Sequence, residues 1–455
     1  MENRQVDPWT EVSGMLRNGA PANEIEIVLD RLDPASLLHA VFALTPDDQR
    51  ALLSLLSPPR AASLVVELPD SHAAALLEEM PVKNAAPIVE ELSSDHRVDV
   101  LGELDKDDAE AIIEQLDEED AIEVRELISH APDQAGGLMM TEFASYPMDK
   151  TVREVIDDLT SDERDYSLLT VHYIYVVAKK RKLKGVIRVR DLIFASPHQK
   201  IGALATPALT VAPDADLDHL ETFFGEHDIA AVPVVDSRQN LLGIVRRRSL
   251  LEALTAKSES DSLKAAGIIG GDELRSMPVL VRSRRRLAWL TINIGLNIVA
   301  ASVIAAYQDT ITAVIALAVF LPIVSDMSGC SGNQAVAVSM RELTLGAAVP
   351  RDVLRVLRKE AFLGLLNGLA LGALLGMAAW AWKGSPVLGL VVGAALAANT
   401  IIAVSIGGSV PLILRKFRFD PAVASGPLLT TVTDMCGFFL LLSLATLALP
   451  VLAPS

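Results

Sequence analysis

Five long apolar segments in the C-terminal part of the chain constrain the fold more than any other feature. They run over about residues 287–307, 311–335, 360–382, 386–414 and 427–452. About 20 helical residues cross a membrane core of roughly 30 Å, and in lipid only helices or closed barrels satisfy all backbone hydrogen bonds. The sequence therefore predicts a multidomain membrane protein in which residues 287–455 form an all-α domain of five transmembrane helices.

Basic residues lie at alternate ends of these segments. Arg282 and residues 284–286 precede the first segment, four basic residues between 351 and 359 precede the third, and three between 415 and 418 follow the fourth. Cytoplasmic loops carry an excess of Lys and Arg, so we expect a cytoplasmic N-terminus and a C-terminus outside.

The first 135 residues contain 30 Asp or Glu and only 9 Lys or Arg, and the whole chain has a net charge of −18. This charge argues against nucleic acid as a partner and favours cations. Both cysteines, Cys330 and Cys436, lie in the apolar part, so neither a disulfide framework nor a CxxC metal site is predicted. No secretory signal opens the chain, and we expect the N-terminal half to stay in the cytoplasm.

A 12-residue repeat fills residues 21–128, in units such as "TPDDQRALLSLL" and "PDSHAAALLEEM". Each unit begins with a capping or first-turn residue and ends with apolar residues at helical spacing. One short helix per unit cannot bury its apolar side alone. We therefore predict an all-α superhelical solenoid over residues 1–135 with acids on its outer face; a solvated face without a ligand is the alternative.

A second repeat has an offset of 58 residues. "YVVAKKRKLKGVIRVRDLI" and "VPVVDSRQNLLGIVRRRSLL" each read as a strand, a polar turn, a strand containing Gly185 or Gly243, and a helix. This pattern resembles a tandem pair of α/β cystathionine-β-synthase (CBS) domains, here 136–198 and 199–255. The resemblance implies an adenosine nucleotide site, for which Asp191 keeps the matching position. Residues 256–286 are expected to form a linking helix and a basic anchor.

Inside the apolar segments lie two acids, Asp326 and Asp434, and no base. Asp326 follows Ile311 by 15 residues, about 22 Å from the outer end, and Asp434 follows Pro427 by seven, about 10 Å from the inner end. Across a core of about 30 Å these depths are similar, so we expect both carboxylates to face one cavity. Protonation, water or a passing cation can offset such a charge, and oxygen ligands with water suit Mg²⁺. A protonated Asp that bonds a neighbouring helix is the alternative.

The order of these parts, with "FLPIVSDMSGCSGNQAVAVSMREL" and "DPAVASGPLLTTVTDMCGFFLLL", resembles the MgtE-type magnesium channels from Pro21 onward. The resemblance implies a homodimer in the bacterial inner membrane, with a pore between two five-helix bundles. It implies that Asp434 holds hydrated Mg²⁺. Asn333 carries over from the family's GGNxGNQ run, whereas Ser328 and Cys330 depart from it, and Asp326 stands where the family often has Gly.

The resemblance also implies that cytosolic Mg²⁺ closes the pore by bridging acids of the N-terminal domain, the CBS pair and the linking helix. Asp95, Asp99, Asp105 and Asp108 are the candidate sensor acids. At the end of the second CBS domain this chain has Arg246, Arg247 and Arg248 where the family has acids. We therefore also consider that these arginines pair directly with the acidic domain.

Three other functions are weighed against a Mg²⁺ channel. A transporter for Co²⁺, Mn²⁺ or Zn²⁺ is favoured by Cys330 and Cys436, which add soft donors near both motifs. A CBS-regulated membrane sensor that transports nothing would leave the polar residues around Asp434 unexplained. A membrane metalloprotease requires intramembrane His ligands, and all eight His lie at or before His227, so an enzyme is not predicted.

Overall fold

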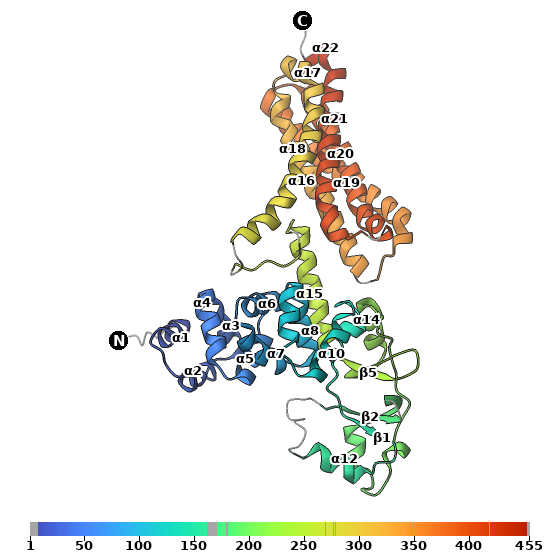
Figure 1. Cartoon of the computed structure of the whole chain (residues 1–455). Coiled ribbons are helices and arrows are strands. Elements are labelled where there is room, and N and C mark those ends of the chain that lie inside the picture. Colours follow the sequence, from blue (N-terminus) through green and yellow to red (C-terminus); the bar gives the residue numbers. More distant parts are fainter. Residues whose placement is uncertain are drawn as a thin grey trace, which may run out of the picture. The chain divides into compact units, whose positions relative to one another are not determined.

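The computed structural model describes residues 8–161, 171–178, 181–268, 270–275, 277, 279–344, 346–417 and 419–452. The chain divides into two units, which are described separately. The first contains residues up to Lys257 together with Leu274–Ser276, and the second contains Ser258–Glu273 and Met277–Ser455. Figure 1 shows the helices and strands of both.

In the described part of the first unit, ten short helices come first. They are α1 (Pro8–Arg17), α2 (Ala22–Leu29), α3 (Pro34–Ala43), α4 (Pro46–Leu55), α5 (Pro58–Val66), α6 (Asp70–Glu78), α7 (Val82–Glu90), α8 (Ser94–Glu103), α9 (Lys106–Ile113) and α10 (Glu118–Ile128). The prediction of one helix per 12-residue unit is confirmed. Asp33 and Thr45 accept hydrogen bonds from the first-turn amides of α3 and α4, which explains where these helices begin.

Helices two units apart pack on one another, as α4 does on α6, α5 on α7, α6 on α8, and α7 on α9. Apolar residues of these helices meet in one core, in which Ile25, Leu52, Ala61 and Val89 are fully buried. Since a single short helix cannot bury its apolar side, this alternate packing is what makes the repeat stable.

The CBS pair follows with two small sheets. Strands β1 (Ser145–Pro147), β2 (Tyr173–Ala178) and β3 (Lys182–Arg188) form the first, and β4 (Ala231–Val235) and β5 (Leu241–Arg246) the second. β2 and β3 are antiparallel, as are β4 and β5. The described residues of this part form the helices α11 (Ala135–Leu138), α12 (Val152–Leu159), α13 (Val189–Ile193), the 3-10 helix η2 (Ile201–Ala203) and α14 (Leu217–Glu226).

The two copies agree in backbone detail at the predicted 58-residue offset. Arg181 and Gln239, in the turns between the paired strands, both have positive φ, at 56° and 64°. Gly185 and Gly243 pair with Val176 and Val234, after which each ladder shifts register. A Cβ on Gly185 would lie 2.5 Å from the Thr206 carbonyl oxygen, so this position requires glycine. Residues 179–180 of the first turn lie outside the described residues.

Helix α15 (Arg247–Ala265) crosses the boundary expected between 255 and 256 without a break. The second unit then contains α16 (Val279–Ala306), α17 (Gln308–Ala313), α18 (Leu317–Thr344), the 3-10 helix η3 (Pro350–Asp352), α19 (Val353–Lys383), α20 (Pro386–Lys416), α21 (Pro421–Leu447) and α22 (Leu449–Leu452). The basic residues before 287 belong to α16 itself. Glu273 pairs with Arg286 and, at 3.2 Å, with Arg282.

Among the described residues, four helical stretches are long and apolar enough to cross a membrane, within α16, α20, α21 and the combined η3 and α19. α18, at the second expected span, is 28 residues long but is not one of them. Its Asp326 and the polar run through Gln334 lower its apolar character.

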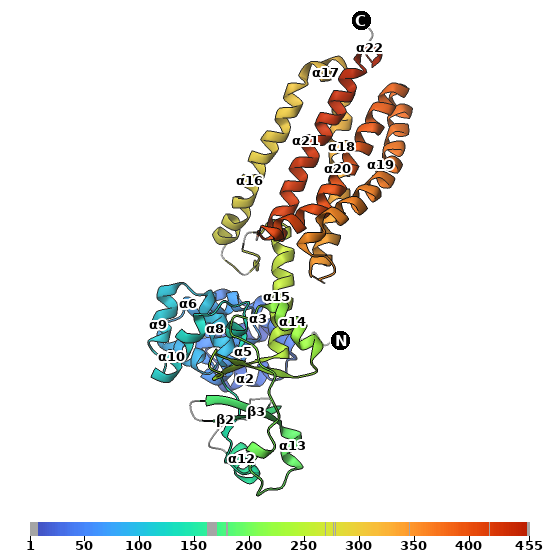
Figure 2. The same ribbon diagram turned by 90° about the vertical axis from the view of Figure 1, so that its right-hand side faces the viewer.

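Small residues let the helices of this unit approach closely. A Cβ on Gly407 of α20 would lie 2.2 Å from the Gly332 carbonyl oxygen of α18, and one on Gly372 of α19 would lie 2.4 Å from that of Gly393. Such contacts are typical of membrane helices, where no hydrophobic effect drives association. Figure 2 shows α21 with α16 on one side and α18 and α20 on the other, and α21 contacts all three.

Candidate functional site

Asp434 is half-buried in the middle of α21, next to α18. The Ser325 hydroxyl of α18 donates a hydrogen bond to its carboxylate. No basic side chain pairs with Asp434 among the described residues, which include all of α18, α19 and α20. A hydroxyl satisfies only part of a carboxylate's capacity to accept hydrogen bonds. The remaining capacity is open to water or a cation.

Asp326 follows Ser325 in the chain, and Ser325 bonds to Asp434. Asp326 and Asp434 therefore lie at the same level of the neighbouring helices α18 and α21. This agrees with the depths estimated from the sequence. Asp326, Cys330 and Asn333 are exposed in the single chain, and their spacings of four and three place them on one side of α18. Polar residues within an apolar helix are costly in lipid, and in membrane proteins they face the bundle interior or a water-filled cavity. We call this side of α18 the polar stripe.

Asp95, at the start of α8, is 5% exposed and is the most buried of the candidate sensor acids. Arg246 donates to its carboxylate at 2.6 Å, and the Ser93 hydroxyl donates at 2.6 Å to the other oxygen. Burial raises the pKa of Asp95, but the Arg246 charge and the Ser93 hydrogen bond outweigh it, so this pKa lies below its usual value.

Of the three arginines at the end of β5 and the start of α15, one therefore pairs with the N-terminal helices. Arg247 instead donates to the carbonyls of Phe224, His227 and Ile229. Arg248 pairs with Glu252, one turn further along α15. Asp95 and Arg246 are 151 residues apart in the chain and join the helical repeat to the second CBS domain.

Asp99 lies one turn after Asp95 and has the opposite environment. Burial, together with the nearby carboxylates of Asp70, Asp95 and Glu103, raises the pKa of Asp99 to about 8. A carboxyl with this pKa is mostly protonated at neutral pH, and a cation that binds Asp99 must displace this proton.

Asp105 and Asp108 lie in a separate group at the start of α9. One carboxylate oxygen from each and one from Glu78 of α6 lie within 4.8 Å of one another, and all three residues are exposed. The sequence reasoning missed Glu78. It lies three repeat units before Asp105 and Asp108, and only the packing of the helices brings it to them.

Asp191, the candidate nucleotide residue, accepts a hydrogen bond from Arg188 at 2.7 Å. Both residues lie at the junction of β3 and α13; Arg188 is exposed and Asp191 is partly exposed. The Asp191 carboxylate is thus partly engaged by a side chain three residues away.

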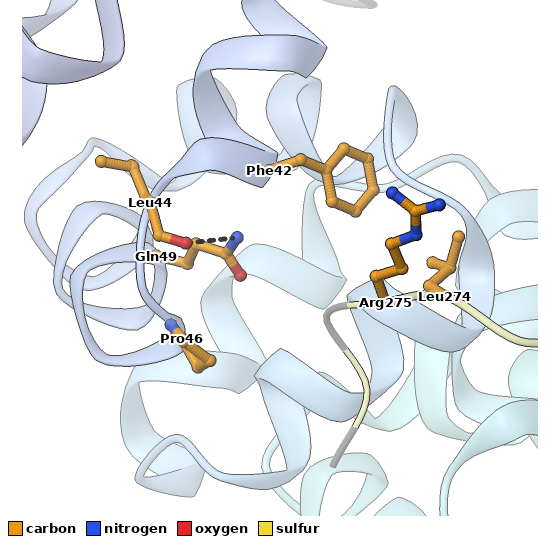
Figure 3. Close-up of a pocket in the computed structure, with 6 residues that line it drawn as sticks. All are labelled: Phe42, Leu44, Pro46, Gln49, Leu274 and Arg275. Carbon is orange, nitrogen blue, oxygen red and sulfur yellow. Dashed lines mark hydrogen bonds between the residues drawn. The ribbon is translucent and has the colours of Figure 1, made fainter. Parts of the chain in front are cut away.

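A hollow of about 500 Å³ lies in the first unit beside α3 and α4. Figure 3 shows its lining, which includes Phe42, Gln49 and Arg275. Gln49 donates to the Leu44 carbonyl at 3.4 Å. None of the acids singled out from the sequence lines this hollow.

Comparisons with known proteins give three family matches. A family described as "Divalent cation transporter" matches residues 321–444, "MgtE intracellular N domain" matches residues 32–133, and the CBS domain matches residues 135–198 and 201–256.

Two proteins named magnesium transporter MgtE are similar over most of their length. That of Thermus thermophilus is 34% identical over 336 residues, which cover 72% of each chain. That of Bacillus subtilis is 30% identical over 324 residues, which cover 71% of each chain. A solved structure of the cytosolic domain of the Mg²⁺ channel MgtE in complex with ATP is 30% identical, with a TM-score of 0.49, and covers 54% of this chain and 99% of that chain.

Proposed function

Since this chain belongs to the MgtE family of divalent cation transporters, we propose that it is a membrane channel that takes up Mg²⁺ and is regulated through its cytosolic domains. The observation that carries this proposal is the half-buried Asp434, held by Ser325 and without a basic partner among the described residues. A carboxylate with hydroxyls and water nearby provides the oxygen ligands of a cation that keeps part of its hydration shell.

The proposal includes a homodimer with five membrane helices per chain and the pore on the two-fold axis. The exposed polar stripe of α18 supports it, because in a single chain Asp326, Cys330 and Asn333 would face lipid. In a symmetric pair the two copies of Asp434 would repel each other unless a cation lay between them. A particle of two chains in mild detergent is expected, and a monomer would contradict this arrangement.

Regulation is proposed to act through the acids of the helical repeat, which we take to be superhelical. Asp99 and the group of Glu78, Asp105 and Asp108 are the proposed sites for regulatory Mg²⁺. Asp95 is not proposed as a Mg²⁺ site, because Arg246 already neutralises its charge. We retain an adenosine nucleotide at Asp191 as a weaker proposal, since Arg188 engages this carboxylate.

A transporter for Co²⁺, Mn²⁺ or Zn²⁺ is the second candidate function. Cys330 is exposed on the polar stripe, and Cys436 is partly exposed two residues after Asp434. Thiolates favour softer cations than Mg²⁺. Uptake of each ion by proteoliposomes, with the others as competitors, separates the two functions.

The test of the main proposal is Asp434→Asn, which keeps shape and polarity and removes the charge. We expect Mg²⁺ uptake by proteoliposomes to be abolished while folding and dimerisation are retained. Asp326→Asn is the matched variant at the same level and is expected to have a smaller effect. Near-normal uptake by Asp434→Asn would show that this carboxylate is a helix-packing group.

A further inference from the structure

Asn399, in the middle of α20, connects this helix to the backbone beside Asp434. Its side chain is fully buried, and its Nδ2 donates a hydrogen bond to the Thr433 carbonyl oxygen at 3.0 Å. Thr433 immediately precedes Asp434 on α21. The contact therefore fixes the backbone of α21 at the position from which the carboxylate extends.

Gly437 makes room for this contact. In a regular α-helix the Thr433 carbonyl accepts from the N–H four residues later, which is that of Gly437. A Cβ on Gly437 would lie 2.7 Å from the Asn399 Nδ2 atom and 3.6 Å from the Ser325 Cα atom. The absent side chain thus allows α18, α20 and α21 to converge around Asp434, and allows the Asn399 amide to reach a carbonyl within a helix.

Packing alone does not explain an asparagine at this position. The Oδ1 atom of Asn399 is buried and has no hydrogen-bond partner among the described residues. An unpaired buried acceptor is destabilising, and a leucine of similar volume would leave none. Thr400, the next residue, is equally buried but bonds within its own helix, to the Leu396 carbonyl at 2.8 Å.

We propose that Asn399 is a positioning residue for ion passage: it sets the rotation of α21 so that Asp434 is held at Ser325, on the side where the cation passes. This inference rests on the proposed function. Asn399 does not touch the cation. It acts through the Thr433 carbonyl on the geometry of the carboxylate, so its loss changes how well the site binds an ion more than how much protein folds.

The test compares Asn399→Leu with Thr400→Val, both in full-length protein in proteoliposomes. For Asn399→Leu we expect the half-saturating Mg²⁺ concentration to rise about tenfold and the ratio of Mg²⁺ to Co²⁺ uptake to fall. Thr400→Val should leave both quantities unchanged. A purely structural role would reduce the amount of active protein and scale the maximal rates of both ions equally. Gly437→Ala, which displaces the amide from the other side, should reproduce the effect of Asn399→Leu.

If Asn399→Leu does not yield folded protein, Gly437→Ala tests the inference through the half-saturating Mg²⁺ concentration and the ratio of Mg²⁺ to Co²⁺ uptake. Unchanged half-saturation and an unchanged ion ratio per folded molecule would overturn the inference and make Asn399 a packing residue. Failure of the unaltered protein to take up Mg²⁺ would instead overturn the proposed function.

Discussion

Neighbouring carboxylates in this protein differ in what neutralises them, as Asp95 and Asp99 on one helix illustrate. Asp95 has a guanidinium and a hydroxyl as donors, and its pKa lies below its usual value although burial alone would raise it. Asp99 is shielded from water among other acids, so its pKa is raised to about 8. Asp95 is neutralised by the Arg246 guanidinium, whereas Asp99 can bind a proton or an external cation.

The raised pKa of Asp99 predicts a pH-dependent stability. The folded chain holds a proton that the unfolded chain releases above its ordinary pKa of 3.8, so this contribution to stability is greatest below about pH 4 and is lost as the pH rises through about 8. Asp99→Asn removes the charge. In Mg²⁺-free buffer we expect it to raise the melting temperature at pH 9 by about 2–4 °C, which corresponds to about 1 kcal/mol, and to change it little at pH 5.

Asp107→Asn, which removes an exposed acid of α9, is the control for this measurement. Equal shifts for the two variants at pH 9 would mean that the general acidity of the domain, rather than the environment of Asp99, determines the effect.

At the scale of elements, two contacts between elements far apart in the sequence position the sites. Arg246, at the end of β5, ties the CBS pair to α8. Gly332 and Gly407 bring α18 and α20 together at the level of the polar stripe. The first contact is electrostatic, and the second depends on the absence of side chains.

Removal of Arg246 should weaken the link between the helical repeat and the CBS pair. Arg246→Ala leaves the buried Asp95 charged and unpaired, which costs about 3–5 kcal/mol when such a pair is fully buried. The Arg246 side chain is 31% exposed, so we expect the lower end of this range. Arg248→Ala breaks only an exposed pair within one helix and should cost about 0.5 kcal/mol or less. Thermal unfolding of the full chain measures both, and equal effects would contradict the role assigned to Arg246.

A side chain at Gly407 should separate α18 from α20. Gly407→Ala places a Cβ 2.2 Å from the Gly332 carbonyl oxygen, so a helix must move. Gly295→Ala, on α16, meets nothing within 4 Å and is the control. We expect a lower melting temperature and reduced Mg²⁺ uptake for the first variant and no change for the second. An unaffected Gly407→Ala protein would mean that the close approach is not required.

The elements of this fold were largely predictable, but their contacts were not. The 12-residue spacing gives each repeat helix, and the 58-residue offset gives the matching turns at Arg181 and Gln239. The hydrogen bond between Ser325 and Asp434 joins residues that are 109 positions apart, and no local sequence pattern predicts such a contact. Asn399 could be recognised from the sequence as a polar side chain within an apolar segment. Its orientation toward Thr433 could not be predicted, because it depends on how three helices pack.

At the scale of the whole molecule, the question is whether the N-terminal acids respond to Mg²⁺ although Asp95 is already paired with Arg246. The acids that remain, Asp99 and the group of Glu78, Asp105 and Asp108, concentrate negative charge on α6, α8 and α9. Like charges at short distance repel unless a cation or a proton lies between them. Mg²⁺ should therefore draw this part of the chain into a more compact state.

Protection from protease tests this response in the full chain. We expect cleavage at residues 129–134 and 266–275, between the helices that end at Ile128 and Ala265 and the elements that follow, to slow as Mg²⁺ rises from zero to about 10 mM, above the affinities typical of weak carboxylate sites. The double variant Asp105→Asn and Asp108→Asn should require several times more Mg²⁺, because two of three clustered oxygen ligands lose their charge. Arg246→Ala should instead make cleavage depend more strongly on Mg²⁺, since an external cation can then occupy the place of the guanidinium at Asp95. Cleavage that is independent of Mg²⁺ in the unaltered protein but dependent on it in Arg246→Ala would mean that the ion pair of Asp95 and Arg246 has replaced sensing by Mg²⁺. Cleavage that is independent of Mg²⁺ in all three proteins would contradict a regulatory role of these acids.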